Sequence, residues 1–216
     1  MELIAENLTV DRGDRRVFEG LSFSLEGGVA LVVTGPNGVG KSSLLRTLAG
    51  LVALAEGHLT LSGGVDDHTP YEHAHYFGHQ DAVKPALSVL ENLVFWQDFS
   101  DAAVPHGFAG DGMSPHEALE LLGIGHTARL PAAYLSAGQK RRLSLSRLLV
   151  TPRPIWLMDE PTSALDTASE QTLLDLMNGH LAKGGMIVTA THTPLALTPM
   201  RKLHLETAQA GEGEAV

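Results

Sequence analysis

The sequence of 216 residues contains no cysteine. Disulfide bonds, thiolate zinc sites and cysteine nucleophiles are therefore excluded. Basic residues are also few, because 15 Lys and Arg stand against 25 Asp and Glu, for a formal net charge of −10. A charge of this sign repels nucleic-acid phosphates and anionic lipid, so we expect no nucleic-acid partner and a local origin for any anion site.

Long apolar runs are missing as well. The best candidate, LAGLVALA at 48–55, is far shorter than the ~20 residues that span a bilayer, so no direct membrane span is expected. The N-terminal MELIAENLTV has no basic segment and does not resemble a secretion signal, which makes the cytoplasm the default location. With 44% apolar and 19% charged residues, the remaining composition is that of an ordinary globular chain of one domain.

Short apolar or β-branched runs alternate with helical patterns, which predicts an α/β fold. Strands are expected at 2–10, 21–25, 29–34, 58–62, 75–78, 155–159, 186–191 and 202–206. Helices are expected at about 41–52, 88–99, 115–122, 138–150, 168–182 and 193–198. Capping boxes indicate three helix starts, at Ser88 with Glu91, Ser114 with Glu117 and Thr167 with Glu170.

Two segments depart from this alternation. Residues 81–135 are mainly helical and contain the glycine-rich stretch 106–114, which predicts a helical subdomain inserted in the α/β core. The last residues, 207–216, are small, polar and acidic, and we expect a flexible tail there.

A glycine-rich segment fits the pattern GxxxxGK[ST], and it lies between a predicted strand and a predicted helix. Its glycines allow backbone N–H groups, the helix N-terminus and Lys41 to converge on the β and γ phosphates of a nucleotide. Ser42 is expected to bind Mg²⁺. A plain glycine-rich turn before a helix is the structural alternative. The expected nucleotide-binding residues here are Gly35, Pro36, Asn37, Gly38, Val39, Gly40, Lys41, Ser42 and Ser43.

The apolar strand at 155–158 leads into two carboxylates, Asp159 and Glu160. They are expected at the C-terminal edge of the sheet, where the phosphate loop also lies. In isolation an acidic pair after a buried strand is more often structural. After a phosphate loop, it predicts that Asp159 holds Mg²⁺ and that Glu160 polarises the attacking water.

The segment LSAGQ at 135–139 distinguishes between P-loop families. Together with the phosphate loop, the acidic strand, SALD at 163–166 and His192 after the strand MIVTAT, it resembles the nucleotide-binding domain of ATP-binding-cassette (ABC) proteins. The resemblance implies ATP and Mg²⁺ as ligands and a single P-loop NTPase domain over 1–206. That domain has a mixed-sheet core, an antiparallel β subdomain and a helical subdomain at about 81–135.

The resemblance also assigns individual residues. It makes Gln80 a catalytic residue and Mg²⁺ ligand, and it makes His192 a catalytic residue that contacts the γ-phosphate. It places Ser136, Gly138 and Gln139 in the nucleotide-binding signature and Asp166 in the neighbouring loop. Considered alone, His192 would more often be a surface histidine, and its position after a core strand favours the catalytic role.

The signature can also be interpreted as a helix start. Ser136 would be the N-cap, but Lys140, Arg141 and Arg142 in the first turns oppose the helix dipole. An anionic partner at that end would remove the conflict. The resemblance implies one, because ABC domains form an ATP-dependent head-to-tail homodimer in which this helix faces the nucleotide of the other copy.

Two further sets of residues differ from the family pattern or stand outside it. Arg12 and Gly13 stand where ABC proteins commonly have Tyr-Gly for adenine stacking, so we expect Arg12, or Phe18 in the next turn, to stack on the base. Four histidines gather around one predicted strand, and we interpret them as exposed edge-strand residues rather than as a metal or haem site. They are His68, His73, His75 and His79.

Within the ABC family, the segments GHQDAVKPALSVLENLVFW, LPAAYLSAGQKRRLSLSRLL and WLMDEPTSALDT resemble the ATP-binding subunit of bacterial cytochrome c maturation. The resemblance implies an ATPase subunit of a haem-transporting translocase, peripheral on the cytoplasmic face of the inner membrane and bound to integral membrane subunits. Whether ATP drives haem transport or release of a haem-loaded chaperone is left open.

The membrane subunits are expected to dock on the helical subdomain beside Gln80, through Trp96 and Phe99, with Leu90, Leu93 and Val94 in that subdomain's own core. Three alternatives stand beside this reading. They are another small-cassette transporter of lipid, drug or nutrient, a soluble cassette protein of DNA repair or ribosomes, and a P-loop GTPase, whose NKxD motif is absent.

Overall fold

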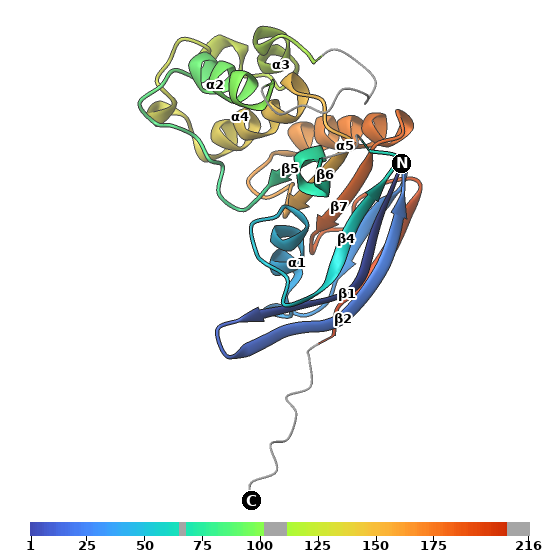
Figure 1. Cartoon of the computed structure of the whole chain (residues 1–216). Helices are drawn as coiled ribbons and strands as arrows, with labels where there is room; N and C mark the ends of the chain where they lie inside the picture. Colours follow the sequence, from blue (N-terminus) through green and yellow to red (C-terminus); the bar gives the residue numbers. More distant parts are fainter. Residues whose placement is uncertain (65–67, 102–111, 207–216) are drawn as a thin grey trace, which may run out of the picture.

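The computed structural model describes residues 1–64, 68–101 and 112–206. A five-stranded sheet in the order β5-β6-β7-β3-β8 lies at the centre, and a three-stranded sheet in the order β2-β1-β4 lies to one side of it (Figure 1). All pairs of the central sheet are parallel, and all pairs of the smaller sheet are antiparallel. The expected combination of the two pairing modes is therefore present, divided between two sheets.

Both faces of the central sheet are covered. Its strands are β3 (Ala30–Thr34), β5 (Ala74–Phe77), β6 (Ile155–Asp159), β7 (Met186–Ala190) and β8 (Met200–His204). Successive side chains of a strand point to opposite faces. In β6, Ile155 and Leu157 join the core shared with α1 and the antiparallel sheet, whereas Trp156 and Met158 join the core shared with the other helices. This double burial explains why the strands are apolar throughout.

The antiparallel sheet consists of β1 (Glu2–Arg12), β2 (Arg15–Glu26) and β4 (Glu56–Ser62). β1 and β2 form a long hairpin, in which Arg12 lies opposite Arg15 and Gly13, at φ 62°, makes the turn. The strand expected at 21–25 is therefore much longer than predicted. In its first half only Val17 and Phe18 are apolar, and they are flanked by exposed charged residues, so this half lacks the run of apolar residues by which a strand is recognised.

The helices are α1 (Lys41–Leu48), α2 (Val89–Asp101), α3 (Pro115–Leu121), α4 (Ala137–Val150) and α5 (Thr167–Ala182), with 3₁₀ turns at Pro70–His73, Gly125–Thr127 and Ala132–Tyr134. α2, α3 and α4 pack against one another at the end of the molecule away from the β1–β2 hairpin (Figure 1). The expected helical segment 81–135 contains α2 and α3, and α4 follows it in the sequence.

Two of the three capping boxes are confirmed. Glu91 and Glu117 each accept a hydrogen bond from the main-chain N–H of the serine three residues earlier, at 2.7 and 2.9 Å. The third helix start was expected at Thr167, and the N-cap lies one residue earlier. Asp166 is the N-cap of α5, and its carboxylate accepts a hydrogen bond of 2.8 Å from the N–H of Ser169.

The helix expected at 193–198 is absent, and the helix expected at 41–52 ends at Leu48. Residues 193–198 form an irregular segment in which Leu195 and Leu197 are both buried against the core. Pro194 lies near its start and Pro199 follows it, and buried residues alternate with exposed ones from 194 to 198, a period that a helix does not have.

Within the described ranges, no helix combines the length and apolarity that a membrane crossing requires. Most of the glycine-rich stretch and the whole acidic tail, 207–216, lie outside the described residues.

Candidate functional site

The loop between β3 and α1 turns back sharply at two glycines. Gly35 has φ 136° and Gly40, the N-cap of α1, has φ 116°. A side chain at either position would be strained, and a Cβ on Gly35 would collide with the main-chain oxygen of Leu205. The loop therefore brings its own backbone around the N-terminus of α1, which is the geometry of a phosphate site.

The ammonium group of Lys41 lies inside this loop. It donates hydrogen bonds of 2.8 Å to the oxygen of Gly35 and 2.9 Å to that of Pro36. Lys41 as a whole is only 9% exposed. Ser42 is exposed beside it, whereas the side chain of Val39 is buried in the core, so any contact of Val39 with a nucleotide uses its backbone.

The acidic pair lies at the C-terminal end of β6. Asp159 is 6% exposed, and Glu160 has φ 47°, a left-handed conformation that a non-glycine residue rarely adopts. His192, just after β7, approaches the Glu160 carboxylate through its ring, with Nε2 3.7 Å from Oε1. Its backbone N–H donates to Oε2 at 3.4 Å. The strained turn therefore aims Glu160 at His192.

One hollow of about 470 Å³ gathers most of the predicted site. The predicted residues that line it are Arg12, Asn37, Gly38, Gly40, Lys41, Ser42, Ser43, Asp159, Glu160 and His192. Cationic and N–H groups lie on the loop side, and carboxylates lie on the β6 side. This arrangement can bind a polyphosphate and place a carboxylate and a histidine beside its end.

The donors in this hollow also suit Mg²⁺. Ser42 offers a hydroxyl and Asp159 a carboxylate, and both line the same space as Lys41. Mg²⁺ prefers such oxygen ligands and usually takes only one or two from the protein, the others coming from phosphates and water. The donor set therefore fits a magnesium–nucleotide complex.

Residues at the hairpin end of β1 and β2 also line the hollow. Arg15, which the sequence did not single out, lines it together with Arg12. Neither arginine forms an ion pair with any residue that the structure describes, whereas neighbouring Arg16 pairs with Asp11 at 3.1 Å and Glu19 at 2.7 Å. The charge of Arg16 is thus compensated by two carboxylates, whereas no described carboxylate forms an ion pair with Arg12 or Arg15.

The alternative role for Phe18 is wrong. Phe18 is 5% exposed and belongs to the core beneath the phosphate loop, where a Cβ on Gly40 would lie 3.4 Å from its ring. A ring buried in this way cannot stack on a nucleobase.

The signature residues lie outside this hollow. Ser136 is the N-cap of α4 and forms a capping box with Gln139, as the structural interpretation expected. Gly138 lies close to the turn before α5, because a Cβ there would be 3.1 Å from the oxygen of Ala164. Ser136 and Asp166 are exposed, so they are available to a partner molecule and not to the chain's own phosphate loop.

Arg141 is a functional candidate that the sequence interpretation missed. It was expected to need an anionic partner, but its guanidinium is turned inward and is 3% exposed. It donates to Gly78 O at 2.8 Å, to the carboxylate of Asp81 at 3.2 Å and to Glu160 O at 2.6 Å. Burial lowers the pKa of Arg141, and the hydrogen bond and charge of Asp81 oppose that shift. The unfavourable interaction of Arg141 with the dipole of α4 is therefore offset by partners within the chain.

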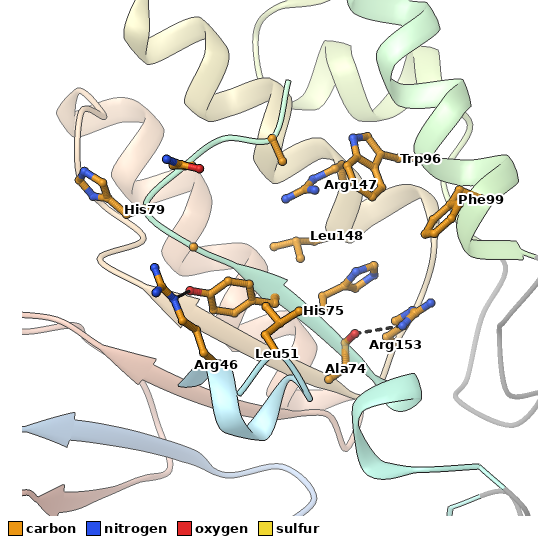
Figure 2. A pocket seen from close by; sticks show the side chains of 14 residues that line it. Arg46, Leu51, Ala74, His75, His79, Trp96, Phe99, Arg147, Leu148 and Arg153 are labelled. Atoms are coloured by element: carbon orange, nitrogen blue, oxygen red, sulfur yellow. Dashed lines mark hydrogen bonds between the residues drawn. The ribbon is translucent and has the colours of Figure 1, made fainter. Parts of the chain in front are cut away.

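Gln80 does not line the hollow that holds Glu160. It follows β5 and lies in a second groove, which Figure 2 shows between α1 and α2. The structure thus separates Gln80 from the other predicted catalytic residues, although all of them follow strands of the same sheet.

The four clustered histidines were expected to be exposed, but only two of them are. His73 is 2% exposed, and the ring of His75 bonds the oxygen of Thr151 at 2.6 Å, whereas His68 and His79 are exposed. Desolvation lowers the pKa of His75 to about 3. Across the described residues, no group of three or more His, Asp or Glu side chains could hold a metal ion.

The expected docking residues divide as follows. Phe99 is 65% exposed and Trp96 is half-buried, and both line the second groove. Leu93 is fully buried and Leu90 packs against the core, as expected. Val94 is 37% exposed, so its assignment to the core is wrong.

Comparisons with known proteins show the family of the chain. The ABC transporter profile matches residues 18–163. The cytochrome c biogenesis ATP-binding export protein CcmA of Nitrobacter winogradskyi is 53% identical over 197 residues, covering 91% of this chain and 94% of that protein. The protein of the same name from Chelativorans sp. is 50% identical over 206 residues, covering 95% and 98%.

The fold has a counterpart of known structure. An ABC transporter (ATP-binding protein) from Pyrococcus furiosus superposes with a TM-score of 0.77 at 21% identity, covering 95% of this chain and 98% of the other. At that identity it supports the fold alone. From the profile match and the near full-length relatives, the chain belongs to the ABC transporter family, in the group of cytochrome c biogenesis ATP-binding export proteins.

Proposed function

We propose that this protein is the ATP-hydrolysing subunit of a membrane complex of cytochrome c biogenesis. The observation that carries the ATPase role is the convergence of Lys41, Glu160 and His192 on one hollow, from three segments far apart in the sequence. The cytochrome role comes from the relatives, whose printed name is that of an export protein of cytochrome c biogenesis.

Hydrolysis can be assigned to particular groups. Lys41 and the N–H groups of the phosphate loop neutralise the β and γ phosphates. A water oxygen attacks the γ-phosphorus, the bond to the β–γ bridging oxygen breaks, and Glu160 accepts the hydrogen bond of that water and orients it. His192, 3.7 Å from Glu160, donates to the γ-phosphate.

Mg²⁺, when bound, neutralises phosphate charge in the hollow. Ser42 and Asp159 would hold it, and Gln80 is assigned to the same ion and to the attacking water. Because Gln80 lies in the neighbouring groove, this assignment requires the segment after β5 to turn toward the phosphate loop. That movement would link the groove to hydrolysis.

The residues left outside the hollow support an ATP-dependent homodimer. Ser136, Gly138, Gln139 and Asp166 belong to the starts of α4 and α5, away from the chain's own nucleotide hollow. In a head-to-tail dimer they would complete the site of the second copy, and hydrolysis would remove the phosphate that both copies share.

The base end of the nucleotide is assigned to the β1–β2 hairpin. Arg12 and Arg15 line the hollow, and their planar guanidinium groups can stack on a nucleobase.

The proposed setting is the cytoplasmic face of the bacterial inner membrane, with the chain bound peripherally to integral membrane subunits beside Gln80. The complex would couple hydrolysis to haem export or to release of a haem-loaded chaperone. Both versions require the same ATPase.

The test is to purify the chain, tagged at its C-terminus, from detergent-solubilised membranes. Mass spectrometry of the bound proteins, a scan for a haem Soret band and an ATPase assay against Lys41→Ala are then compared. Haem-handling membrane subunits and a Soret band, with activity lost in Lys41→Ala, are expected. Unrelated permeases without haem would contradict the cytochrome role and leave the ATPase role intact.

A further inference from the structure

Tyr134 is the most exposed large apolar or aromatic residue in the described part of the chain. It is 79% exposed and stands two residues before Ser136, the N-cap of α4. Among the described residues its hydroxyl has no hydrogen-bond partner, and its ring contacts no other aromatic ring. A single exposed ring is common on protein surfaces, so its position decides whether it can bind a ligand.

The backbone that carries Tyr134 is held on both sides. Tyr134 ends the 3₁₀ turn Ala132–Tyr134, and its N–H donates to the oxygen of Pro131 at 3.0 Å. The N–H of Ala132 donates to the oxygen of Leu87 at 2.9 Å, and Leu135 is buried. The ring therefore projects from a fixed point, which lowers the entropy cost of binding a ligand.

Tyr134 and Ser136 face the same way. Leu135 between them has extended backbone angles, φ −70° and ψ 141°, and is only 5% exposed. Alternate residues of extended backbone point to the same side, so Tyr134 and Ser136 both point away from the core. Their Cα atoms are about 7 Å apart at the usual rise of such backbone. A ligand that lies along Ser136 can therefore also reach the ring of Tyr134.

The chain's own nucleotide hollow lacks an aromatic face for the base. No described Phe, Tyr or Trp lines it, and Phe18 is buried beneath the phosphate loop. Arg12 and Arg15 offer guanidinium planes there, which can cover one face of a base. The other face stays in water unless a second molecule covers it, and stacking on an aromatic ring is favourable for any base.

We infer that Tyr134 stacks on the adenine of the nucleotide bound to the second copy of the chain, on the face opposite the hairpin arginines. The inference rests on the proposed function, because the head-to-tail homodimer places Ser136 at the phosphates of that nucleotide. Tyr134, on the same side of the backbone as Ser136, then reaches the base. Each base is held between Arg12 of one copy and Tyr134 of the other.

The first experiment locates the base directly. The Glu160→Gln chain, which should accumulate as the dimer, is irradiated with Mg²⁺ and azido-ATP, an analogue with a photoreactive azide on the adenine. Mass spectrometry of the labelled peptides should find label at residue 134. The same chain with Ser136→Arg, which should bind ATP as a monomer, is the matched control and should carry no label at residue 134.

The second experiment removes the ring. Tyr134→Ala should raise the KM for ATP about tenfold. The KM for ribose triphosphate, which lacks the base, should not change. Tyr134→Phe keeps the ring and should restore the KM for ATP. Leu130→Ala, 48% exposed on the same segment, is the control for the loss of an exposed apolar side chain and should leave both KM values unchanged.

The outcomes separate this inference from the proposed function. A dimer that forms with azido-ATP but carries no label at residue 134 would overturn the inference and leave the dimer intact. An equal rise of both KM values in Tyr134→Ala would do the same. Label at residue 134 in the Ser136→Arg monomer would show that base and ring meet within one chain, which also overturns it. If Glu160→Gln binds ATP but forms no dimer, the proposed dimer fails, and this inference fails with it.

Discussion

The guanidinium group of Arg141 donates a hydrogen bond of 2.6 Å to the main-chain oxygen of Glu160. The same group bonds Gly78, at the end of β5, and Asp81, beside Gln80. One side chain of α4 thus ties the turn that carries the proposed base to the segment of Gln80, which lines the second groove. The position of Glu160 therefore depends on contacts between α4, β5 and β6.

Replacing Arg141 should affect stability and catalysis together. Arg141→Met leaves Asp81 and three main-chain oxygens without their buried donor, which should lower the free energy of unfolding by about 3 kcal/mol. We expect kcat to fall while the KM for ATP changes little, because Glu160 loses its support and the phosphate loop is untouched. Urea unfolding and steady-state kinetics measure both effects. Arg142→Met, which loses one bond to Leu122, is the control, and an equal loss there would contradict this role.

Glu160→Gln should separate binding from turnover. The amide retains the size of the side chain but cannot accept the developing proton, so hydrolysis should fall about a hundredfold or more. ATP binding should persist, and the dimer should accumulate. Phosphate release, equilibrium dialysis with ATP and light scattering test these points. Turnover at the wild-type rate would show that another group activates the water.

Ser136→Arg tests the composite site. Ser136 caps α4 and lies outside the chain's own nucleotide hollow, so a large cation there should leave binding of ATP to the single chain within about twofold. It should prevent the closed dimer from forming and so abolish hydrolysis. ATP titration of the monomer and analytical ultracentrifugation of the Glu160→Gln background give the two readouts. Normal activity in Ser136→Arg would argue that one chain hydrolyses ATP alone.

The hairpin arginines should hold the base end of the nucleotide. Arg12→Ala and Arg15→Ala should each raise the KM for ATP several-fold at unchanged kcat, because stacking and charge act equally on ground state and transition state. Binding of inorganic tripolyphosphate should change less than binding of ATP. Arg16→Ala, whose charge is already used by Asp11 and Glu19, is the control. If neither variant alters the KM, the base is held elsewhere.

Two histidines with lowered pKa values, the buried His180 and the half-buried His75, predict how stability changes at acid pH. Burial lowers the pKa of His180 to about 4 and that of His75 to about 3, from the ordinary 6.5. The unfolded chain therefore takes up more protons below pH 6.5 than the folded chain does. Stability should be complete above that pH and should fall as the pH drops toward about 4, by up to ~1.4 kcal/mol per pH unit for each histidine.

His180→Phe tests this slope. The ring of His180 stacks on Trp156 at a centroid distance of 4.0 Å, and phenylalanine can keep that contact. It cannot replace the hydrogen bond to Pro154, so stability at pH 8 should fall by about 1 kcal/mol. The loss between pH 6.5 and 5 should become smaller. Urea midpoints at several pH values, with exposed His126→Phe as the control, would contradict the assignment if the two slopes remained equal.

Much of the fold and of the nucleotide site was predictable because its signals are local. The phosphate loop, its helix and Lys41 are contiguous, and capping boxes such as Ser114 with Glu117 join residues only three positions apart. The acidic end of β6 follows from one apolar strand. Such patterns are decided by backbone geometry within a few residues, so they can be recognised without knowing what packs on them.

Other features depended on what each side chain meets in the folded chain. Phe18 is buried under Gly40, and the segment 193–198 is shaped by the core beneath Leu195 rather than by its own helix propensity. The hydrogen-bond partners of Arg141 come from segments far apart in the sequence. In the same way, Arg46 of α1 and Arg153 before β6 line one groove only because of the tertiary fold. The sequence by itself determined the chemistry of ATP binding, since that chemistry resides in contiguous motifs. Only the tertiary structure decided which charges are compensated, because compensation depends on distances between elements that the linear order does not specify.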